Sequence, residues 1–461
     1  MSMGTLAMVA ESVGGTLYGA DCSFESVTTD TREMTDGQLF FALRGERFDA
    51  ARFVQEAARR GAAGAVVERR QDCSLAQVEV SDTRSALGRL ARSWRARFSI
   101  PVVAVTGSNG KTTVKEMLAA ILRAGAARED EVLVTRGNLN NEIGLPMTVL
   151  KLRDSHRWAV LEMGASHRGD IAYLADIAQP DVGVVTNAAA AHLEGFGSLA
   201  DVAATKGEIL ERLPSDGVAI INQDDRFYGF WLSLCRAGTI VSFGLAEESD
   251  YRAVDIQEIE LADAPALSFQ LLCPAGRTNI RLPMAGRHNV RNALAAAAAA
   301  VAVGADFDTL ARGLEILQNI PGRLRRVPSP NGVTIYDDSY NANPASVKAA
   351  ISFLAERDGE TWLVLGDMAE LGPSSEALHR EIGETARAAG VTRLFCVGPQ
   401  ARAAAGAFGA GSTWYPALTS LAEDMRAELQ PGVVILVKGS RCMGLEKLVA
   451  GIATTNAEVT S

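Results

Sequence analysis

Hydrophobic positions follow two spacings along the chain, and the alternation between them predicts a mixed α/β protein. Uninterrupted apolar runs rich in β-branched residues are typical of strands buried in a parallel sheet. Apolar residues that recur every three or four positions are typical of amphipathic helices. Between residues 99 and 318 the two patterns alternate, which predicts a mainly parallel sheet covered by helices on both faces. Its strands are predicted at 101–105, 132–135, 158–163, 182–186 and 217–222.

The pattern changes at 238–284, where strand-like alternation replaces helical spacing. Strands are predicted there at 256–261 and 266–272, and we interpret the segment as an antiparallel extension of the sheet. The alanine-rich stretch 289–303 that follows predicts a buried helix.

Both flanking regions carry the same two patterns on a smaller scale. Strand-like runs at 38–43 and 64–67, with helical spacing at 50–60 and 83–97, predict a small N-terminal α/β domain. Beyond the turn at 320–322 a second βαβ series predicts a doubly wound, Rossmann-like domain. Its strands are expected at 334–336, 361–365, 393–397 and 433–437, and its helices at 344–356, 374–389, 399–406 and 416–428.

Composition limits the classes of protein to be considered. The chain has 461 residues, 48% hydrophobic and 22% charged, with a net charge of −10, which argues against general binding to nucleic acid or to a membrane surface. Its six cysteines include no C-x-x-C pair, as expected of free thiols in a reducing compartment. The longest apolar run, 293–303, is too short to cross a bilayer, and no signal-peptide core is present. We therefore expect a cytoplasmic protein that does not insert into membranes, with a monomer as the default.

The segment Thr106–Thr113 carries the most specific chemistry, because it is glycine-rich and lies between a predicted strand and a predicted helix. In that context backbone N–H groups and the helix N-terminus face an anion. Lys111 would reach the β- and γ-phosphates of a bound nucleotide, and the Thr112 hydroxyl would bind Mg²⁺. Val105 stands where the usual spacing has glycine, so the motif is a variant. We predict an α/β protein of three domains: a small α/β domain at 1–98, a central phosphate-loop ATPase-type domain at 99–318 and a Rossmann-like domain at 319–461.

Three further residues lie where parallel strands end or just beyond. Glu162 ends a predicted strand and would suit Mg²⁺, although a carboxylate there can also be a helix cap or a surface acid. His192 follows the next strand and could bind a metal or a phosphate, but taken alone it is better interpreted as a hydrogen-bonded structural histidine. Lys206 lies in the segment 205–208 that opens the next predicted helix, and because a lone lysine is usually a solvated surface residue, a functional role is no better supported than a surface position.

Polar clusters at other strand ends suggest ligand contacts. The amides of 138–141 would suit a carboxylate or a sugar, and those of Asn289 and Asn292 a purine or ribose. Arg323, in a hinge-like turn, is a candidate clamp for the γ-phosphate. The dense polar segment 337–344 and the strand ends at 365–372 and 438–441 are expected to line one cleft that faces the nucleotide domain.

Together these motifs resemble the Mur ligases, the ATP-dependent amide-forming enzymes of bacterial cell-wall synthesis. The resemblance covers about 26–446, and its most specific parts are 140–144, 337–344 and 366–372. The variant phosphate loop is itself the form found in that family. The resemblance implies ATP and Mg²⁺ as cofactors, and UDP-N-acetylmuramoyl-tripeptide and D-alanyl-D-alanine as substrates joined through an acyl phosphate. The N-terminal domain would hold the UDP-sugar, and the C-terminal domain the dipeptide and part of ATP.

The same resemblance assigns roles to individual residues. Residues near the metal would be Thr112, Glu162, His192 and Lys206, the last after reaction with CO₂ to a carbamate. ATP would be bound by Gly107, Ser108, Asn109, Gly110, Lys111, Thr112, Thr113, Asn289, Arg323 and Asp338. Catalysis would involve Lys111, Lys206, His192, Glu162 and Arg323. Substrates would be bound by Thr31, Arg32, Phe40, Ala42, Asn138, Asn140, Asn141, Tyr340, Asn341 and Asn343.

Two departures from the family pattern concern the UDP-substrate segment. Asp49 is followed by Ala50, Ala51 and Arg52 where Gly-His is usual, and Thr31 replaces a serine. Alternative functions are a ligase of the same type that adds the third amino acid, a folylpolyglutamate synthetase, or a nucleotide-dependent switch. The segments 338–344 and 366–372 argue against the first two, and the polar strand ends outside the central domain argue against the switch.

Overall fold

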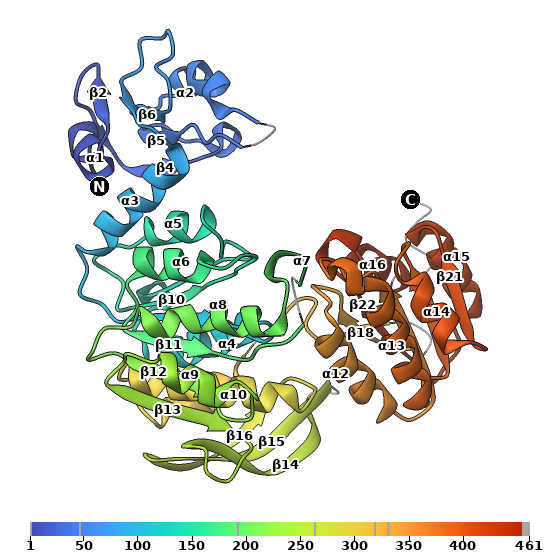
Figure 1. Ribbon diagram of the computed structural model, residues 1–461. Coiled ribbons are helices and arrows are strands. Elements are labelled where there is room, and N and C mark those ends of the chain that lie inside the picture. The colour runs from blue at the N-terminus through green and yellow to red at the C-terminus, as the bar shows by residue number, and fades with distance from the viewer. Residues whose placement is uncertain are drawn as a thin grey trace.

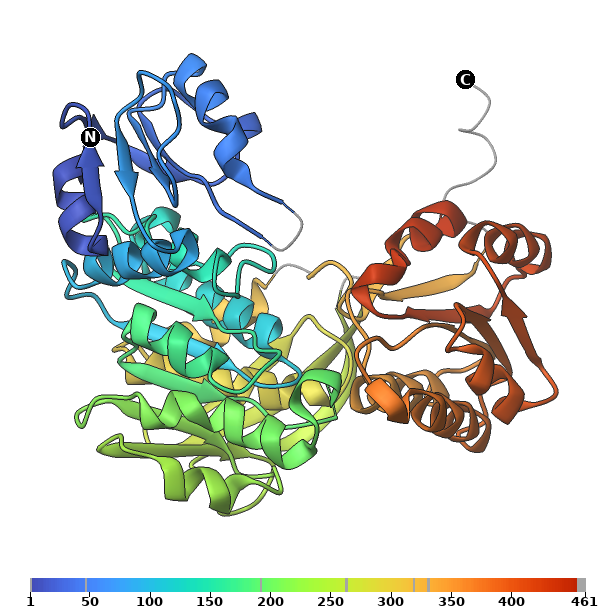
Figure 2. The ribbon, with the colours of Figure 1, turned by 45° about the horizontal axis from the view of Figure 1, so that its top comes forward.

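The computed structural model describes residues 2–45, 48–190, 193–261, 264–317, 320–329 and 332–453. It contains three separate main sheets in an α/β fold, so the predicted fold class is confirmed. The N-terminal and C-terminal regions both adjoin the central region and lie apart from each other in both views (Figures 1 and 2).

The N-terminal region is built on a five-stranded sheet in the order β2-β7-β6-β5-β4. All neighbours are parallel except β2, which pairs antiparallel with β7. Its strands are β2 (Thr16–Tyr18), β4 (Ser26–Thr28), β5 (Gln38–Phe41), β6 (Gly64–Val67) and β7 (Gln77–Glu79), with β1 (Gly4–Thr5) and β3 (Ser23–Phe24) forming a separate pair. The helices are α1 (Leu6–Val13), α2 (Val54–Arg59) and α3 (Thr83–Arg95), with 3₁₀ turns η1 (Thr31–Glu33) and η2 (Ala50–Phe53).

The central region holds a nine-stranded sheet in the order β16-β15-β14-β13-β12-β11-β8-β10-β9. Its strands are β8 (Val102–Thr106), β9 (Val132–Val134), β10 (Trp158–Glu162), β11 (Val182–Val185), β12 (Val218–Asn222), β13 (Thr239–Gly244), β14 (Tyr251–Leu261), β15 (Ala264–Cys273) and β16 (Gly276–Leu282). Its helices are α4 (Lys111–Gly125), α5 (Gly144–Val149), α6 (Asp170–Ala178), α7 (Leu193–Phe196), α8 (Leu199–Glu211), α9 (Tyr228–Leu234), α10 (His288–Ala302) and α11 (Thr309–Glu315), with a 3₁₀ turn η3 (Glu129–Glu131).

Helices cover both faces of this sheet, as the apolar strands require. One face is buried by α4, α10 and α11, and the other by α5, α6, α8 and α9. The expected antiparallel extension at 238–284 is right only for β14, β15 and β16. It is wrong for β13, which pairs in parallel with β12 because the chain returns through α9 before β13 begins. The end of β13 also pairs in parallel with the start of β14.

The C-terminal region has a six-stranded sheet in the order β17-β18-β22-β19-β20-β21, parallel except for the edge strand β17. Its strands are β17 (Arg325–Val327), β18 (Thr334–Asp338), β19 (Glu360–Gly366), β20 (Arg393–Val397), β21 (Ser412–Tyr415) and β22 (Val433–Lys438). Its helices are α12 (Pro344–Ala355), α13 (Ser375–Ala388), α14 (Arg402–Phe408), α15 (Leu418–Glu428) and α16 (Glu446–Ala453), with 3₁₀ turns η4 (Gly372–Ser374) and η5 (Arg441–Met443). The short edge strands β17 and β21 were not predicted.

Helix α3 joins the N-terminal region to the central one through an apolar core. Leu87, Leu90 and Trp94 belong to one buried cluster that continues from the N-terminal sheet into α5 and α6. The Trp94 indole donates to the Leu152 carbonyl at 3.2 Å, and the Arg95 guanidinium donates to the Ala178 carbonyl at 3.0 Å. The two regions therefore share a core, whereas the C-terminal region has clusters that are almost entirely its own.

None of the described helices combines the length and the apolar character needed to cross a bilayer.

Candidate active site

The phosphate loop connects β8 to α4 as predicted, and its two glycines are required by space as well as by backbone conformation. Gly107 and Gly110 have φ of +144° and +81°. A Cβ atom on Gly107 would lie 1.9 Å from the Thr186 hydroxyl oxygen, and one on Gly110 would lie 2.4 Å from the Asn292 side-chain oxygen. A side chain at either position would displace the loop, so the open turn at the start of α4 depends on both glycines.

Lys111 is the first residue of α4, and its side chain turns back over the loop. Its ammonium donates to the carbonyls of Gly107 at 2.7 Å and Ser108 at 3.2 Å. Burial lowers the pKa of Lys111, and the nearby charge of Arg323 adds to that effect. An anion bound in the loop would stabilise the charged form of Lys111 against both burial and the repulsion by Arg323, as expected of a phosphate-binding lysine.

Glu162 ends β10 next to the phosphate-loop strand and is only 2% exposed. Its backbone N–H donates to the Thr135 hydroxyl at 3.0 Å, and its Oε1 accepts from the Asn140 amide at 2.8 Å. Its Oε2 has no hydrogen-bond partner among the described residues. The buried Lys115 ammonium forms an ion pair with this oxygen at 3.9 Å, which is too long for a hydrogen bond. The oxygen can therefore still accept a metal ion, so this residue fits the magnesium site expected there.

The C-terminal region supplies a second wall of the site. Arg323 donates to the Thr112 hydroxyl at 3.2 Å, and its guanidinium lies 4.3 Å from the centre of the Tyr340 ring. Asn343 caps α12 and donates to the Asn109 side-chain oxygen at 2.7 Å. These contacts bring residues of the predicted polar cluster 337–344 directly to the phosphate loop.

The end of β18 is held to the end of β22 by a buried ion pair. The Lys438 ammonium donates to Asp338 at 2.7 Å and to the Asn341 carbonyl at 2.9 Å. The other Asp338 oxygen accepts from the backbone of Leu324, which has a left-handed φ of +52°. This arrangement fixes the turn that carries Arg323.

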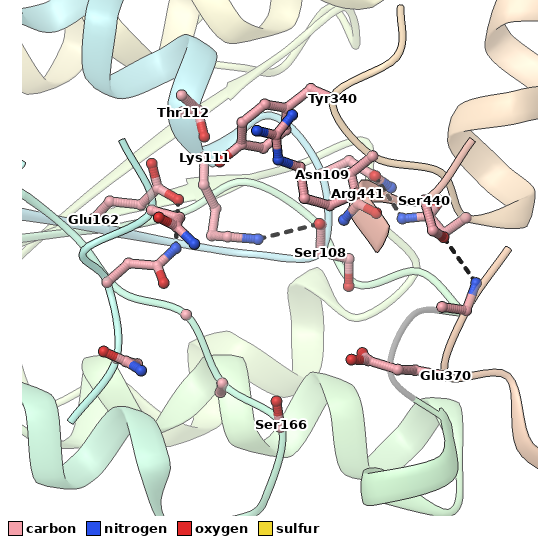
Figure 3. Close-up of a pocket in the computed structure, with 18 of the residues that line it drawn as sticks. Ser108, Asn109, Lys111, Thr112, Glu162, Ser166, Tyr340, Glu370, Ser440 and Arg441 are labelled. Carbon is pink, nitrogen blue, oxygen red and sulfur yellow. Dashed lines mark hydrogen bonds between the residues drawn. The ribbon is translucent and has the colours of Figure 1, made fainter. Parts of the chain in front are cut away.

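Two neighbouring cavities lie between the central and C-terminal regions. The larger, about 840 Å³, is lined by the phosphate loop, the 138–142 loop, the 164–174 segment and C-terminal strand ends (Figure 3). The smaller, about 360 Å³, is lined by Asn289, Asn292 and Asp338 among others. The Asn289 amide donates to the Ala285 carbonyl at 2.7 Å, and the Asn292 amide donates to Asn289 at 2.9 Å. The larger cavity has room for phosphates and a second substrate, and the smaller adjoins it as a nucleoside site would.

Lys206 lies on α8 and is 2% exposed, so the surface interpretation of this residue is wrong. Burial, together with the charge of Lys111, lowers the pKa of Lys206 to about 7. Its ammonium lies 5.3 Å from the centre of the Phe196 ring on α7. A lysine with this pKa has a large neutral fraction at neutral pH, which is the form that reacts with CO₂.

The sequence-predicted residues divide into two groups in space. Most of them line the two cavities: Ser108, Asn109, Gly110, Lys111, Thr112, Thr113, Asn138, Asn140, Asn141, Glu162, Asn289, Arg323, Asp338, Tyr340, Asn341 and Asn343. Gly107 and Lys206 are not among the residues that line either cavity, and the N-terminal candidates do not reach these cavities. Phe40 and Ala42 pack in the N-terminal core at 1% and 2% exposure, so only their backbone groups remain for a ligand. Arg32 is exposed and pairs with Asp30 at 2.6 Å, next to buried Thr31.

His192, predicted to lie near the metal, falls outside the described residues. The cavity lining also includes residues that the sequence did not single out, notably Ser166, His167, Asp170 and Tyr173. The feature of the sequence that could have identified them is their position directly after β10, because ligands bind beyond the carboxyl ends of parallel strands.

A phosphate loop on a parallel sheet, closed by cations and amides from a second doubly wound region, defines a multidomain nucleotide-dependent enzyme. Three family descriptions match in chain order: Mur ligase family, catalytic domain at 23–95, Mur ligase middle domain at 105–300, and Mur ligase, glutamate ligase domain at 322–441. The chain belongs to the Mur ligase family.

Relatives of known name support this membership over the whole chain. The UDP-N-acetylmuramoyl-tripeptide–D-alanyl-D-alanine ligase of Escherichia coli is 45% identical over 451 residues, covering 97% of this chain and 98% of that one. The protein of the same name from Bacillus subtilis is 36% identical, covering 96% and 97%. The crystal structure of MurF from Acinetobacter baumannii matches with a TM-score of 0.89 and 36% identity over 98% of both chains. MurF ligase from Thermotoga maritima in complex with ADP matches with a TM-score of 0.83 and 29% identity, over 93% and 97%.

Proposed function

We propose that this protein uses ATP to join D-alanyl-D-alanine to UDP-N-acetylmuramoyl-tripeptide, forming an amide bond in peptidoglycan precursor synthesis. The observation that carries the proposal is the joint wall of the larger cavity, where the phosphate loop meets Arg323 and Asn343 of the C-terminal region. The 45% identical relative, matched over 97% of this chain and 98% of its own length, is named for this reaction.

The proposed reaction has two steps. An oxygen of the tripeptide carboxylate attacks the γ-phosphorus of ATP, and ADP leaves, so that an acyl phosphate forms. The amine nitrogen of the dipeptide then attacks the acyl carbon, loses a proton and expels inorganic phosphate. Activation is needed because a free carboxylate is a poor acyl donor.

Charge on the transferring phosphoryl group is neutralised by this chain's own cations. Lys111 lies over the loop and Arg323 reaches it from the C-terminal region, both already within hydrogen-bonding distance of atoms of the loop motif. Fixed cations in a partly buried site stabilise a developing charge without reorganising, which is the main contribution expected in phosphoryl transfer. Enclosure between two regions also keeps water from the acyl phosphate.

A magnesium ion would be held by Glu162, whose buried Oε2 lacks a donor, and by the Thr112 hydroxyl. When bound, such an ion supplies further positive charge to the phosphates. The neutral amine of Lys206 would react with CO₂ to form a carbamate, releasing one proton and adding an oxygen ligand to the same site. The low pKa and burial of Lys206 support this assignment.

The remaining parts of the proposal concern substrate placement and the state of the protein. We assign the UDP moiety to the N-terminal region and the dipeptide to the C-terminal one, with the ATP site between them. We expect a monomer in the cytoplasm, where ATP and nucleotide-linked precursors are present. Light scattering after size exclusion would test the oligomeric state.

One assay tests the function: ADP release with ATP, magnesium and both proposed substrates. We expect release that requires UDP-N-acetylmuramoyl-tripeptide and D-alanyl-D-alanine together. Turnover with a UDP-N-acetylmuramoyl precursor that carries only two amino acids, together with a single diamino acid, would instead indicate a ligase that adds the third residue. Hydrolysis of ATP that no substrate stimulates would indicate a nucleotide-dependent switch.

A further inference from the structure

The Arg323 side chain is held at the larger cavity by an aromatic ring. Its guanidinium carbon lies over the ring of half-buried Tyr340, 4.3 Å from the ring centre. On the other side its Nη2 donates to the Thr112 hydroxyl at 3.2 Å. The Arg323 Nε is buried and has no hydrogen-bond partner among the described residues. This buried N–H group is therefore still able to donate to a ligand.

The backbone of Tyr340 packs against the turn that carries Arg323. The Tyr340 N–H donates to the Gly322 carbonyl at 3.2 Å. Gly322 has a left-handed φ of +69°, and a Cβ atom on it would lie 2.9 Å from the Tyr340 Cβ atom. A glycine is required for so close an approach. The ring and the guanidinium are thus placed together by two backbone segments in direct contact.

The charges around Arg323 explain why a ring suits this position better than an acid. Burial lowers the pKa of Lys111 and the charge of Arg323 lowers it further, so the two cations repel each other. An acidic partner would hold Arg323 against this repulsion, but it would also neutralise the charge that a phosphate needs. The face of an aromatic ring attracts a cation and leaves its charge available.

The nearby charged groups have other partners. No carboxylate of the described residues forms an ion pair with Arg323, and Asp338 at the end of β18 pairs with Lys438 at 2.7 Å instead. The Arg441 guanidinium lies 5.7 Å from the centre of the Tyr340 ring, but it pairs with Glu446 at 3.4 Å. Arg323 is therefore the nearer cation to the ring and the one without an acidic partner.

We infer that Tyr340 is a positioning residue for Arg323: its ring holds the guanidinium beside the phosphate loop, with the Nε–H available to an oxygen of the transferring phosphoryl group. Tyr340 lines the larger cavity together with Lys111 and Thr112 (Figure 3). The inference rests on the proposed function and adds a residue that acts through Arg323. The resemblance to the Mur ligases implies instead that Tyr340 binds substrate, and the two roles predict different kinetics.

Tyr340→Leu tests the inference, since it removes the ring and keeps an apolar side chain. We expect kcat/KM for ATP to fall about 3- to 30-fold, the fold-change that a partly buried cation–π contact supplies. The KM for D-alanyl-D-alanine should stay within about twofold of wild type, because Arg323 acts on the phosphoryl group. A rise in that KM with unchanged kcat/KM for ATP would overturn the inference in favour of direct substrate binding.

Two further variants separate the ring from the rest of the side chain and from the fold. Tyr340→Phe keeps the ring, so its kcat/KM for ATP should recover to within about twofold of wild type. A tenfold loss in this variant would overturn the inference. The matched control is Tyr18→Leu on β2, where Arg70 lies 5.3 Å from the centre of a ring that is 37% exposed and outside both cavities. It should change neither kinetic quantity.

The Arg323→Met background decides whether the ring acts through Arg323. Adding Tyr340→Leu to Arg323→Met should lower kcat/KM for ATP by no more than about twofold. The same 3- to 30-fold fall in both backgrounds would overturn the inference, because Tyr340 would then act independently of Arg323. ADP release that depends on neither proposed substrate, even in wild type, would contradict the proposed function instead. The same variants can be compared on that ATP hydrolysis, so the inference is tested in either case.

Discussion

The central region meets its two neighbours through junctions of opposite character. Toward the N-terminus, α3 continues one apolar core from sheet to sheet, with Leu87, Leu90 and Trp94 buried in it. Toward the C-terminus the contacts are mostly polar: Arg323 with Thr112, Asn343 with Asn109, and Arg357 with Glu258. The first junction excludes water and the second encloses the two cavities.

The difference indicates what each junction is for. Separating an apolar core exposes its surface to water at roughly 25 cal/mol per Å², so the N-terminal region is expected to stay fixed to the central one. Each polar contact contributes only about 0.5–1.5 kcal/mol net, because water can replace it. The C-terminal junction can therefore rearrange as substrates bind and products leave. Substitutions at the two junctions should accordingly affect different properties.

The largest effect is expected at the polar junction. Arg323→Met should lower kcat by about 10²- to 10³-fold, because a fixed cation that reaches the phosphate loop is lost. The temperature of unfolding should remain within about 2 °C of wild type, since few apolar contacts change. Steady-state ADP release and calorimetry measure the two quantities. Arg326→Met, on the same segment but exposed, is the control and should retain activity. A large fall in the temperature of unfolding of Arg323→Met would contradict the prediction, because the polar junction would then also be needed for stability.

Helix α7 contacts both Lys206 and the loop that holds Glu370. Substituting Lys206 tests whether this part of the polar junction takes part in catalysis. Lys206→Ala should lower kcat by about 10²-fold or more, and added short carboxylates should restore part of it. A variant with full activity would remove Lys206 from the mechanism.

The same residue predicts a pH dependence of stability. Burial lowers the pKa of Lys206 from 10.5 to about 7, so the unfolded chain holds the proton more tightly than the folded one. The cost of burying the amine is then full below pH 7 and declines as pH rises toward 10.5. Relative to Lys206→Met, wild type should gain stability over that range, measured by denaturant unfolding. A difference that does not vary with pH would contradict the lowered pKa.

At the apolar junction the expected effect is on stability. Trp94→Ala should lower the free energy of unfolding by about 3–5 kcal/mol, the usual cost of removing a buried tryptophan. The kcat and KM for ATP, measured where the variant remains folded, should change less than twofold. Arg92→Ala on the exposed face of α3 is the control for helix propensity. Loss of catalysis in folded Trp94→Ala would show that both junctions serve chemistry.

The smallest effect is expected for one polar contact taken alone. Asn343→Ser keeps a residue that caps α12 well but no longer reaches the Asn109 side chain. The KM for ATP should rise about two- to tenfold, and stability should change by less than about 0.5 kcal/mol. A rise of a hundredfold would mean that Asn343 touches the nucleotide directly.

Much of this molecule could be predicted from local patterns. Strands in each of the three sheets follow from apolar runs, and the phosphate loop from glycine, lysine and threonine at fixed spacing, but short edge strands such as β17 and β21 do not. The direction of β13 could not be predicted, because its partner is chosen by the path of the chain through α9. The surface interpretation of Lys206 failed for a related reason. A single lysine has no local signal for burial, which comes from α7 and from the sheet beneath α8.

The sequence by itself determined the kinds of element, their order and the chemistry of each loop, since these depend on neighbours a few positions apart. Tertiary structure alone decided which loops meet. Asn109 and Asn343, 234 positions apart, share a hydrogen bond, and Glu162 is left with a carboxylate oxygen to which no described residue donates a hydrogen bond. The tertiary structure also made the N-terminal junction a continuous apolar core and the C-terminal junction a polar interface that encloses the cavities. Packing between distant segments sets burial, charge balance and access to water, and no local pattern carries that information.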